Sequence, residues 1–330
     1  MSGAVTAGTP VRILVSERTR DAIGDAIAAA LNGATPVFVA PGEDADLAFV
    51  SREVTGLSTK HQVMPETQRF YDGMANAPSL RWVQMHSAGA DRPIYLALRR
   101  RGVVVTSSSG TNAAIVAQTA LAGILALGRG FPQLIEAQRE HRWSSLVKTG
   151  MPRDLEGQTA TIVGWGPIGQ RLAALLSLLG LSVGAVRSSG ANAAPAAFTV
   201  PFERLGEVLP RTDWLVLACP LTDRTRGLVD RAALALLPAG ARIVNVARGE
   251  VVDEAALIDA LRGGRLAGAF LDVFAQEPLP PESALWSLPN VLVWPHSAGH
   301  SDGNERRVAE FFLGNLARWA QGLPLVNAVA

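Results

Sequence analysis

The sequence predicts an α/β protein built from two doubly wound parallel sheets. Short runs of branched apolar residues alternate with amphipathic stretches along the whole chain, which is the pattern of βαβ units. The length of 330 residues suits two domains better than one core. Hydrophobic residues make up 48% of the chain and charged residues 18%, so each domain can bury a core of its own.

The first hundred residues contain five strand candidates with three helical segments among them. Strands are expected at 11–16, 36–40, 46–51, 80–87 and 103–106. Helices are expected at 19–30, 64–77 and 94–101. Because strands that alternate with helices form a parallel sheet covered on both faces, this segment should form one α/β domain.

A second series follows a helical stretch at 113–150. Its six strands are expected at 160–166, 181–186, 214–219, 241–247, 266–273 and 290–295. Its helices are expected at 167–179, 230–237 and 253–261. Six strands in this alternation suit a dinucleotide-binding sheet. An amphipathic helix at 304–321 ends the pattern, and the sequence leaves open which domain it closes.

Composition and charge exclude several classes of protein. Thirty Lys and Arg residues against 29 Asp and Glu leave a net charge of +1, without the basic field of a nucleic-acid binder. The single cysteine, Cys219, excludes a disulfide framework, and no histidines show metal-ligand spacing. The most apolar run, 113–128, is short for a membrane span, and the N-terminus lacks the pattern of a secretory signal. We therefore expect no nucleic acid, membrane or metal partner and a cytoplasmic location.

A glycine-rich turn opens the second series. Gly164, Gly166 and Gly169 form G-x-G-x-x-G between an apolar strand and a helix, with Pro167 and Ile168 in the same turn. The first glycine permits a tight turn, the second lets the backbone approach a pyrophosphate, and the third allows close helix packing. A glycine-rich turn without a ligand is the alternative, but the strand–turn–helix context favours a dinucleotide.

The next strand leads into Arg187 and Ser188, where an NAD-specific site normally places Asp or Glu. An arginine beside a hydroxyl offers hydrogen bonds to a 2′-phosphate, whereas a carboxylate would repel it. We therefore expect NADPH/NADP as the preferred cofactor, with NAD possible. A solvated surface arginine is the alternative.

Three segments at the ends of predicted strands supply one arginine, one carboxylate and one imidazole: Arg248, Glu277 and His296. Reduction of a 2-keto acid needs an acid for the carbonyl oxygen and a cation for the carboxylate. It also needs a carboxylate that keeps the acid protonated. Each residue alone has an ordinary structural explanation, as a surface residue, a turn or a cap. All three behind a dinucleotide turn favour catalysis.

These motifs resemble the D-2-hydroxyacid dehydrogenase family, with glyoxylate/hydroxypyruvate reductases as the suggested branch. The motifs are the glycine turn and the segments NVARGEVVDEAAL, LDVFAQEPLP and NVLVWPHSAG. The resemblance implies a Rossmann cofactor domain, residues 113–299, inserted into a flavodoxin-like substrate domain, residues 1–112 and 300–330.

By this resemblance, His296 is the general acid and base, Glu277 pairs with it and raises its pKa, and Arg248 holds the substrate. The resemblance also implies further cofactor contacts at Cys219, Pro220, Thr225, Val246, Ala247, Asp272 and Gly299.

The segment HSAGADRP resembles the family's S-x-G-V-D loop. The N–H groups of Ala88 and Gly89 are therefore expected to bind the substrate carboxylate. Arg52, which follows a strand, is a weaker candidate for substrate contact, with a solvated face as the alternative. The crossover helix at 106–129 implies dimer contacts, so we expect a homodimer.

We therefore expect an NAD(P)-dependent oxidoreductase that interconverts a small 2-keto acid and its D-2-hydroxy acid, reducing glyoxylate- or hydroxypyruvate-like acids with NADPH. Two alternatives stay open. One is an NAD-linked dehydrogenase of a bulkier D-2-hydroxy acid or of phosphite-like anions, and the other is a nucleotide-sensing corepressor. Because no further domain follows the last expected helix, a long phosphoglycerate dehydrogenase is not expected.

Overall fold

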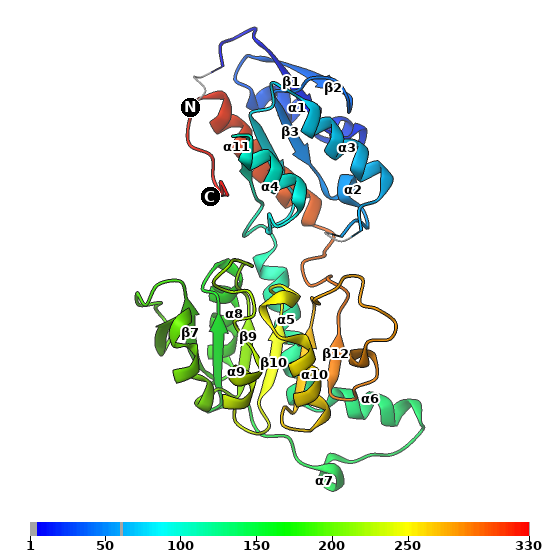
Figure 1. Cartoon of the computed structure of the whole chain (residues 1–330), viewed down its shortest axis with the longest axis vertical. Helices are drawn as coiled ribbons and strands as arrows, with labels where there is room; N and C mark the ends of the chain where they lie inside the picture. Colours follow the sequence, from blue (N-terminus) through cyan, green and yellow to red (C-terminus); the bar gives the residue numbers. More distant parts are fainter. Residues whose placement is uncertain (1–4, 60–61, 330) are drawn as a thin grey trace. The chain divides into compact units, whose positions relative to one another are not determined.

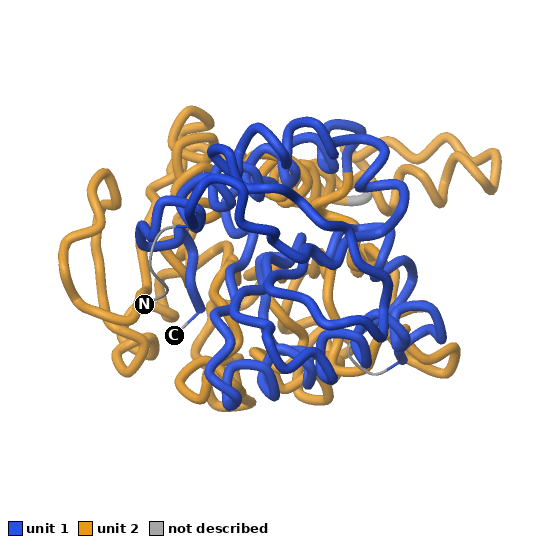
Figure 2. Tube along the Cα trace, turned by 90° about the horizontal axis from the view of Figure 1, so that it is seen from above, with its two compact units in different colours: residues 1–112, 301–330 blue, residues 113–300 orange. Residues whose placement is uncertain are grey.

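The chain forms two compact units in the computed structural model, which describes residues 5–59 and 62–329. One unit comprises Met1–Asn112 with Ser301–Ala330, and the other comprises Ala113–His300 (Figure 2). The chain therefore leaves the first unit after Asn112 and returns to it at Ser301, so the second unit is an insertion.

The sheet of unit 1 has five strands. They are β1 (Pro10–Leu14), β2 (Thr35–Val39), β3 (Leu47–Val50), β4 (Trp82–Met85) and β5 (Val104–Thr106). Their order is β2-β1-β3-β4-β5, and every neighbouring pair is parallel. This is the order of flavodoxin-like sheets. All five strands lie where the sequence predicts them, with bounds that differ by no more than two residues.

Helices cover both faces of this sheet (Figure 1). They are α1 (Glu17–Ala30), α2 (Arg52–Thr55), α3 (Pro65–Asn76), α4 (Pro93–Arg100) and α11 (Asn304–Ala320). Along β3, Phe49 packs in one cluster with Phe312 of α11, and its neighbour Val50 packs in another with Phe70 of α3. The period-two alternation of a strand thus gives each face its own apolar layer. The last helix, whose place the sequence left open, belongs to unit 1.

The sheet of unit 2 has seven strands. They are β6 (Thr159–Val163), β7 (Ser182–Arg187), β8 (Phe198–Pro201), β9 (Trp214–Leu217), β10 (Arg242–Asn245), β11 (Gly268–Leu271) and β12 (Val291–Val293). Their order is β12-β11-β10-β9-β6-β7-β8, all parallel. Taking β6 as the first strand, this is the Rossmann order 3-2-1-4-5-6 with one strand added. The predicted fold class is therefore confirmed.

Strand β8 was not predicted from the sequence, which indicates six strands in this sheet. It is a four-residue edge strand that pairs only with β7, follows a loop of small residues and ends in Pro201. A proline cannot donate to a ladder and is tolerated at such an edge. Nothing in its local composition separates this strand from the loop before it.

Helices and 3₁₀ turns cover the sheet of unit 2. The α-helices are α5 (Ala113–Gly128), α6 (Phe131–Arg139), α7 (Leu146–Thr149), α8 (Pro167–Leu178), α9 (Arg231–Leu236) and α10 (Glu254–Arg262). The 3₁₀ turns are η1 (Phe202–Glu207), η2 (Leu209–Arg211), η3 (Gly249–Val251) and η4 (Ala284–Trp286).

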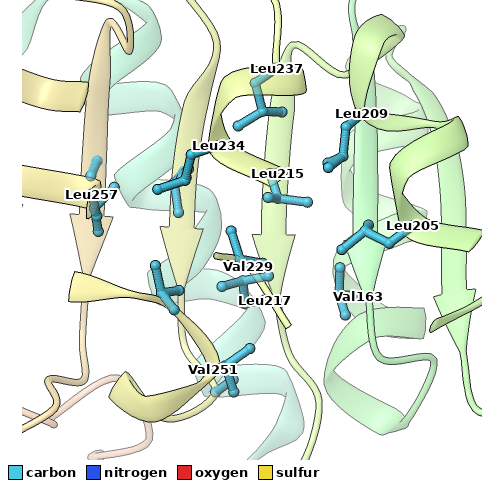
Figure 3. Packing of buried hydrophobic residues seen from close by; sticks show 14 of the residues in the cluster. Val163, Leu205, Leu209, Leu215, Leu217, Val229, Leu234, Leu237, Val251 and Leu257 are labelled. Carbon is cyan, nitrogen blue, oxygen red and sulfur yellow. The ribbon is translucent and has the colours of Figure 1, made fainter. Parts of the chain in front are cut away.

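Two apolar layers hold these elements on the sheet. Leu215 and Leu217 of β9 pack with Leu234 of α9 and Leu257 of α10 on one face (Figure 3). Val216, between the two leucines, lies in a separate cluster with residues of α5 and α8. Because each layer is anchored on central strands, the carboxyl ends of those strands are held in fixed register, and the candidate site is built on them.

Among the described residues, no single helix has the length and apolar composition of a membrane span. The helices α5 and α6, which are bent by 70° at their junction, meet that criterion only when they are taken together.

Candidate active site

The strand order of unit 2 reverses between β6 and β9, and open α/β sheets bind ligands outside the carboxyl ends of strands at such a point. The glycine turn follows β6, and the segment from Cys219 to Thr225 follows β9. The sheet therefore brings two of the predicted cofactor segments to one place.

The three glycines of the turn differ in their surroundings. Gly164 has φ +104°, and a Cβ there would lie 2.6 Å from the backbone of Ala218. A Cβ on Gly169 would lie 2.1 Å from the carbonyl oxygen of Gly164. Both positions therefore exclude side chains because of protein packing. A Cβ on Gly166 would meet nothing within 4 Å.

Gly166 borders open space at the start of α8, where no side chain caps the helix. Pro167 is the first residue of that helix and has no N–H to leave unpaired. Exposed N–H groups and the helix dipole favour an anion at such a terminus. The turn thus fits the pyrophosphate of a dinucleotide, and the second glycine lets that group approach the backbone.

Two arginines lie near the end of β7, Arg187 in the strand itself and Arg224 in the loop after β9. Arg187 is the last residue of β7, and its guanidinium makes no hydrogen bond or ion pair with a described residue. Arg224 donates from Nη2 to the carbonyl oxygen of Ser188 at 3.0 Å and to Glu203 Oε1 at 2.7 Å. These bonds to Arg224 lower the pKa of Glu203. Arg224 was not predicted as a site residue, because its loop after β9 lies far along the chain from Ser188.

The remaining cofactor candidates after β9 shape their own loop. Thr225 Oγ1 donates to the carbonyl oxygen of Pro220 at 2.7 Å and accepts from the N–H of Thr222 at 2.8 Å. Cys219 is buried, and burial raises the pKa of its thiol to about 12. The thiol is therefore neutral and packs as a small apolar group.

After β10, a buried asparagine holds the turn that carries Arg248. Asn245 Nδ2 donates to the carbonyl oxygen of Arg248 at 3.1 Å, and Asn245 Oδ1 accepts from the N–H of Ala247 at 3.0 Å. Val246 and Ala247 are buried, whereas Arg248 is half-buried. Asn245 was not predicted as a site residue, although a polar amide at the end of an apolar strand could have identified it.

His296 and Glu277 form the central pair of the site. His296 Nδ1 lies 2.7 Å from Glu277 Oε2, and the N–H of Phe274 donates to Glu277 Oε1 at 3.1 Å. Burial acts to raise the pKa of Glu277, but the hydrogen bond and charge of His296, with smaller effects of Phe274 and Arg248, lower it overall. Glu277 is therefore ionised at neutral pH. The ring of His296 keeps Nε2 without a hydrogen bond to any described residue.

Asp272 braces the loop that carries His296. His296 has φ +50°, a left-handed conformation that is unusual for a residue with a side chain. Its N–H donates to the carbonyl oxygen of Asp272 at 2.8 Å. The carboxylate Oδ1 of Asp272 accepts from the N–H groups of Ser297 and Ala298 at 2.7 and 2.9 Å. Burial raises the pKa of Asp272. The sequence predicted a cofactor contact here, and the structure adds this bracing role.

Gly299 follows in the same loop, after Ala298, whose carbonyl oxygen accepts from Thr119 Oγ1 of α5 at 3.1 Å. His300 has an exposed side chain, and its N–H donates to the carbonyl oxygen of Ser297 at 3.0 Å. The loop is therefore held by hydrogen bonds to Asp272 through the N–H of Ala298 and to Thr119 through its carbonyl oxygen. Within residues 5–59 and 62–329, no cluster of three His, Cys, Asp or Glu residues has metal-binding geometry.

The other predicted substrate contacts lie in unit 1. The loop after β4 begins at His86, whose N–H donates to the carbonyl oxygen of Val50 at 2.9 Å. The N–H groups of Ala88 and Gly89 donate to no acceptor in the described part of the chain, so both remain available to an anion. Arg52 begins α2.

Comparison with known proteins identifies the relatives of this chain. The family model described as D-isomer specific 2-hydroxyacid dehydrogenase, NAD binding domain, matches residues 121–298. A D-3-phosphoglycerate dehydrogenase of Mycobacterium bovis is 38% identical over 223 residues, which cover 68% of this chain and 42% of that protein. This chain thus matches less than half the length of that relative.

Two further relatives match over most of their length. A glyoxylate reductase of Aeropyrum pernix is 33% identical over 266 residues, covering 78% of each chain. A crystal structure of a D-isomer specific 2-hydroxyacid dehydrogenase from Xanthobacter autotrophicus, in complex with NADPH and MES, is 31% identical, with a TM-score of 0.76 and 98% of each chain covered.

The lowered pKa of Glu277 predicts a pH-dependent contribution to stability. Its usual value is 4.5 and its folded value is lower. The ionised carboxylate therefore stabilises the fold above about pH 4.5, and this contribution is lost as the pH falls through the folded pKa. Glu277→Gln should lower the urea midpoint of unfolding at about pH 6, and the difference from the unsubstituted protein should shrink below about pH 4.

Glu282→Gln is the control for that experiment, because Glu282 is exposed and should change the midpoint little at either pH. A difference for Glu277→Gln that stays constant across this range would show that the charge of Glu277 does not stabilise the fold.

Proposed function

Because this chain belongs to the D-isomer specific 2-hydroxyacid dehydrogenase family, we propose that it interconverts a small 2-keto acid and its D-2-hydroxy acid. The main support for this reaction is the hydrogen-bonded pair of His296 and an ionised Glu277, which lies at the carboxyl edge of a Rossmann sheet. A buried carboxylate that holds an accessible imidazole, with one ring nitrogen free, is suited to pass a proton to and from a substrate oxygen.

The bound cofactor supplies or accepts the hydride, and the residues of unit 2 hold it. Gly166 and the N-terminus of α8 suit the pyrophosphate, and Arg187 with Arg224 suits an adenosine 2′-phosphate. We therefore propose NADPH as the preferred cofactor, which is also the cofactor bound in the Xanthobacter relative. An NADPH-linked reduction suits the cytoplasm, and we propose that location.

The protein's own groups handle the substrate and its proton. His296 Nε2 donates a proton to the carbonyl oxygen of the keto acid, while Glu277 accepts from Nδ1 and fixes the orientation of the ring. Arg248 binds the carboxylate and polarises the carbonyl, for which a planar guanidinium is suited. The N–H groups of Ala88 and Gly89 complete the carboxylate site, and Arg52 is a further candidate contact.

For the substrate we propose glyoxylate or hydroxypyruvate. The support is similarity to the glyoxylate reductase of Aeropyrum pernix, which matches over 78% of both chains. A spectrophotometric assay of NADPH oxidation with glyoxylate, hydroxypyruvate, pyruvate and phenylpyruvate tests both the activity and the substrate. A protein that binds NADPH but reduces none of these acids would contradict the proposed function.

We also propose that the protein is a homodimer. The segment after α5 exposes several large apolar side chains: Phe131, Ile135, Trp143, Val147 and Met151. Trp143 is 98% exposed and Val147 77% exposed, which is unfavourable unless another surface covers them. A second copy of the chain, pairing through this segment, would bury them.

Loss of the proton donor should stop turnover without affecting cofactor binding. His296→Ala should lower kcat by about 10²–10⁴-fold, the usual effect of losing general acid–base catalysis. NADPH binding, measured by fluorescence, should be unchanged. The control is His300→Ala, which removes an exposed imidazole four residues away and should keep most of the activity. Full activity of His296→Ala would place the proton donor elsewhere.

The charge at the end of β7 should set the cofactor preference. Arg187→Asp should weaken NADPH binding by about 10-fold or more and favour NADH, since it replaces a cation with a group that repels the 2′-phosphate. Arg224→Gln should weaken NADPH binding without affecting NADH. Arg171→Asp, at an exposed position on α8, is the charge-matched control. An unchanged ratio of the two dissociation constants would contradict these roles.

Removal of the exposed indole should weaken the dimer. Trp143→Asp introduces a charge that is costly to bury at an interface. Sedimentation equilibrium should then show a mass near 34.7 kDa in place of twice that value. The exposed Leu178→Asp on α8 serves as the control. A single-chain mass for the unsubstituted protein at micromolar concentration would refute the homodimer.

A further inference from the structure

A carboxylate lies beside one of the cations that we propose for the 2′-phosphate of NADPH. It belongs to Glu203, the second residue of η1, which follows the edge strand β8. Arg224, in the loop after β9, donates to Glu203 Oε1 from Nη2 at 2.7 Å and from Nε at 3.1 Å. Nη2 of Arg224 also donates to the carbonyl oxygen of Ser188, after β7, at 3.0 Å. Segments that follow β7, β8 and β9 therefore meet at this guanidinium.

The guanidinium of Arg224 has two further supports that carry no charge. Its Cζ lies 5.4 Å from the centroid of the Phe202 ring, a cation–π contact. Phe202 is buried in the apolar layer on one face of the sheet of unit 2, so the ring is held in place by the core. The carbonyl oxygen of Ser188 is the second support. The position of Arg224 therefore does not depend on Glu203 alone.

The two arginines near the end of β7 differ in the balance of their charges. The guanidinium of Arg187 has no hydrogen bond or ion pair within the part of the chain that the structure describes. The charge of Arg224 is balanced by Glu203, and the hydrogen bonds from Arg224 lower the pKa of that carboxyl. Glu203 is therefore ionised at neutral pH. An anion that approaches this edge meets one unbalanced cation and one balanced cation.

The ion pair of Arg224 and Glu203 is open to solvent. The Arg224 side chain is 49% exposed and that of Glu203 62% exposed. An ion pair between exposed side chains stabilises a protein little, so its partners can be exchanged at low cost. A phosphate monoester carries a charge between about −1.5 and −2 at pH 7 and three acceptor oxygens, more than one carboxylate offers. A 2′-phosphate should therefore take Arg224 from Glu203.

The exchange is not free of cost, because Glu203 stays near the phosphate after it loses Arg224. Two anions at close range repel each other, which weakens the binding of a cofactor that carries the 2′-phosphate. A cofactor with a 2′-hydroxyl has the opposite effect on the pair. Arg224 then keeps Glu203 as its partner, and no cation is left unbalanced when NADH binds.

We propose that Glu203 is a specificity-determining residue that reduces the preference of this site for NADPH over NADH. It is the counter-ion of Arg224 when the ribose carries a 2′-hydroxyl. It competes with the 2′-phosphate for Nε and Nη2 of Arg224 when the cofactor is NADPH. This inference rests on the proposed cofactor site, and it adds a residue that opposes the phosphate to the two arginines that favour it.

Calorimetric titration of the full chain with adenosine 2′,5′-bisphosphate and with 5′-AMP tests the proposal, because the two probes differ only in the 2′-phosphate. Glu203→Gln keeps the shape of the side chain and removes its charge. It should strengthen binding of the bisphosphate about 3–10-fold, since the repulsion is lost and Nε and Nη2 are easier to take over. The affinity for 5′-AMP should stay the same.

Glu207→Gln is the matched control. Glu207 lies on the same 3₁₀ turn, is 54% exposed and pairs with Arg204 at 2.6 Å. This variant removes the same charge from the same turn and should change neither affinity. Glu203→Gln should also lose most of its effect in the Arg224→Gln background, where no guanidinium remains to be released. Unchanged circular dichroism spectra would show that the variants fold.

Bisphosphate binding that Glu203→Gln leaves unchanged or weakens would overturn the proposal. An equal gain with Glu207→Gln would overturn it as well, because net charge alone would then explain the effect. So would a gain that persists in full without Arg224. If the unsubstituted protein does not bind the bisphosphate, the proposed NADPH site fails and this inference fails with it. If it binds but does not respond to Glu203→Gln, only this inference fails.

Discussion

A buried carboxylate stays ionised only if the protein supplies a counter-charge or hydrogen bonds, and Glu277 receives both. The imidazole of His296 lies 2.7 Å away, and the N–H of Phe274 donates to its second oxygen. These interactions outweigh the cost of burial and lower the pKa of Glu277. The orientation of the imidazole, and with it any proton transfer from Nε2, depends on this one pair.

Hydrogen bonds to Asp272 fix the backbone of the loop that carries His296. Three N–H groups of the loop converge on Asp272, one on its carbonyl oxygen and two on its carboxylate. Such a network holds His296 in a left-handed conformation that a free chain rarely adopts. Asn245 braces the turn before Arg248 with two hydrogen bonds, one from its Nδ2 to the carbonyl oxygen of Arg248 and one from the N–H of Ala247 to its Oδ1. Two buried polar side chains at strand ends thus position the arginine and the imidazole.

Each of the two sheets reverses its strand order once, and each has open space beside that point. In unit 2 the feature is open space beside Gly166 at an uncapped helix terminus. In unit 1 it is a pocket lined by Arg52. Reversal leaves a crevice because the helices that follow adjacent strands lie on opposite faces of the sheet. The same topological rule therefore underlies the cofactor proposal for unit 2 and the position of the pocket in unit 1.

The sequence by itself determined the fold class, eleven of the twelve strands that the structure describes, and the glycine turn, because apolar periodicity and glycine spacing are local properties. It also pointed to Arg248, Glu277 and His296, though their roles stay predictions. Only the tertiary structure decided which unit α11 closes, that Arg224 contacts Ser188, and that Asp272 braces the histidine loop. It alone showed that Arg52 lines a pocket without a carboxylate partner among the described residues. These facts depend on which segments the sheets bring together, and no local pattern carries that information.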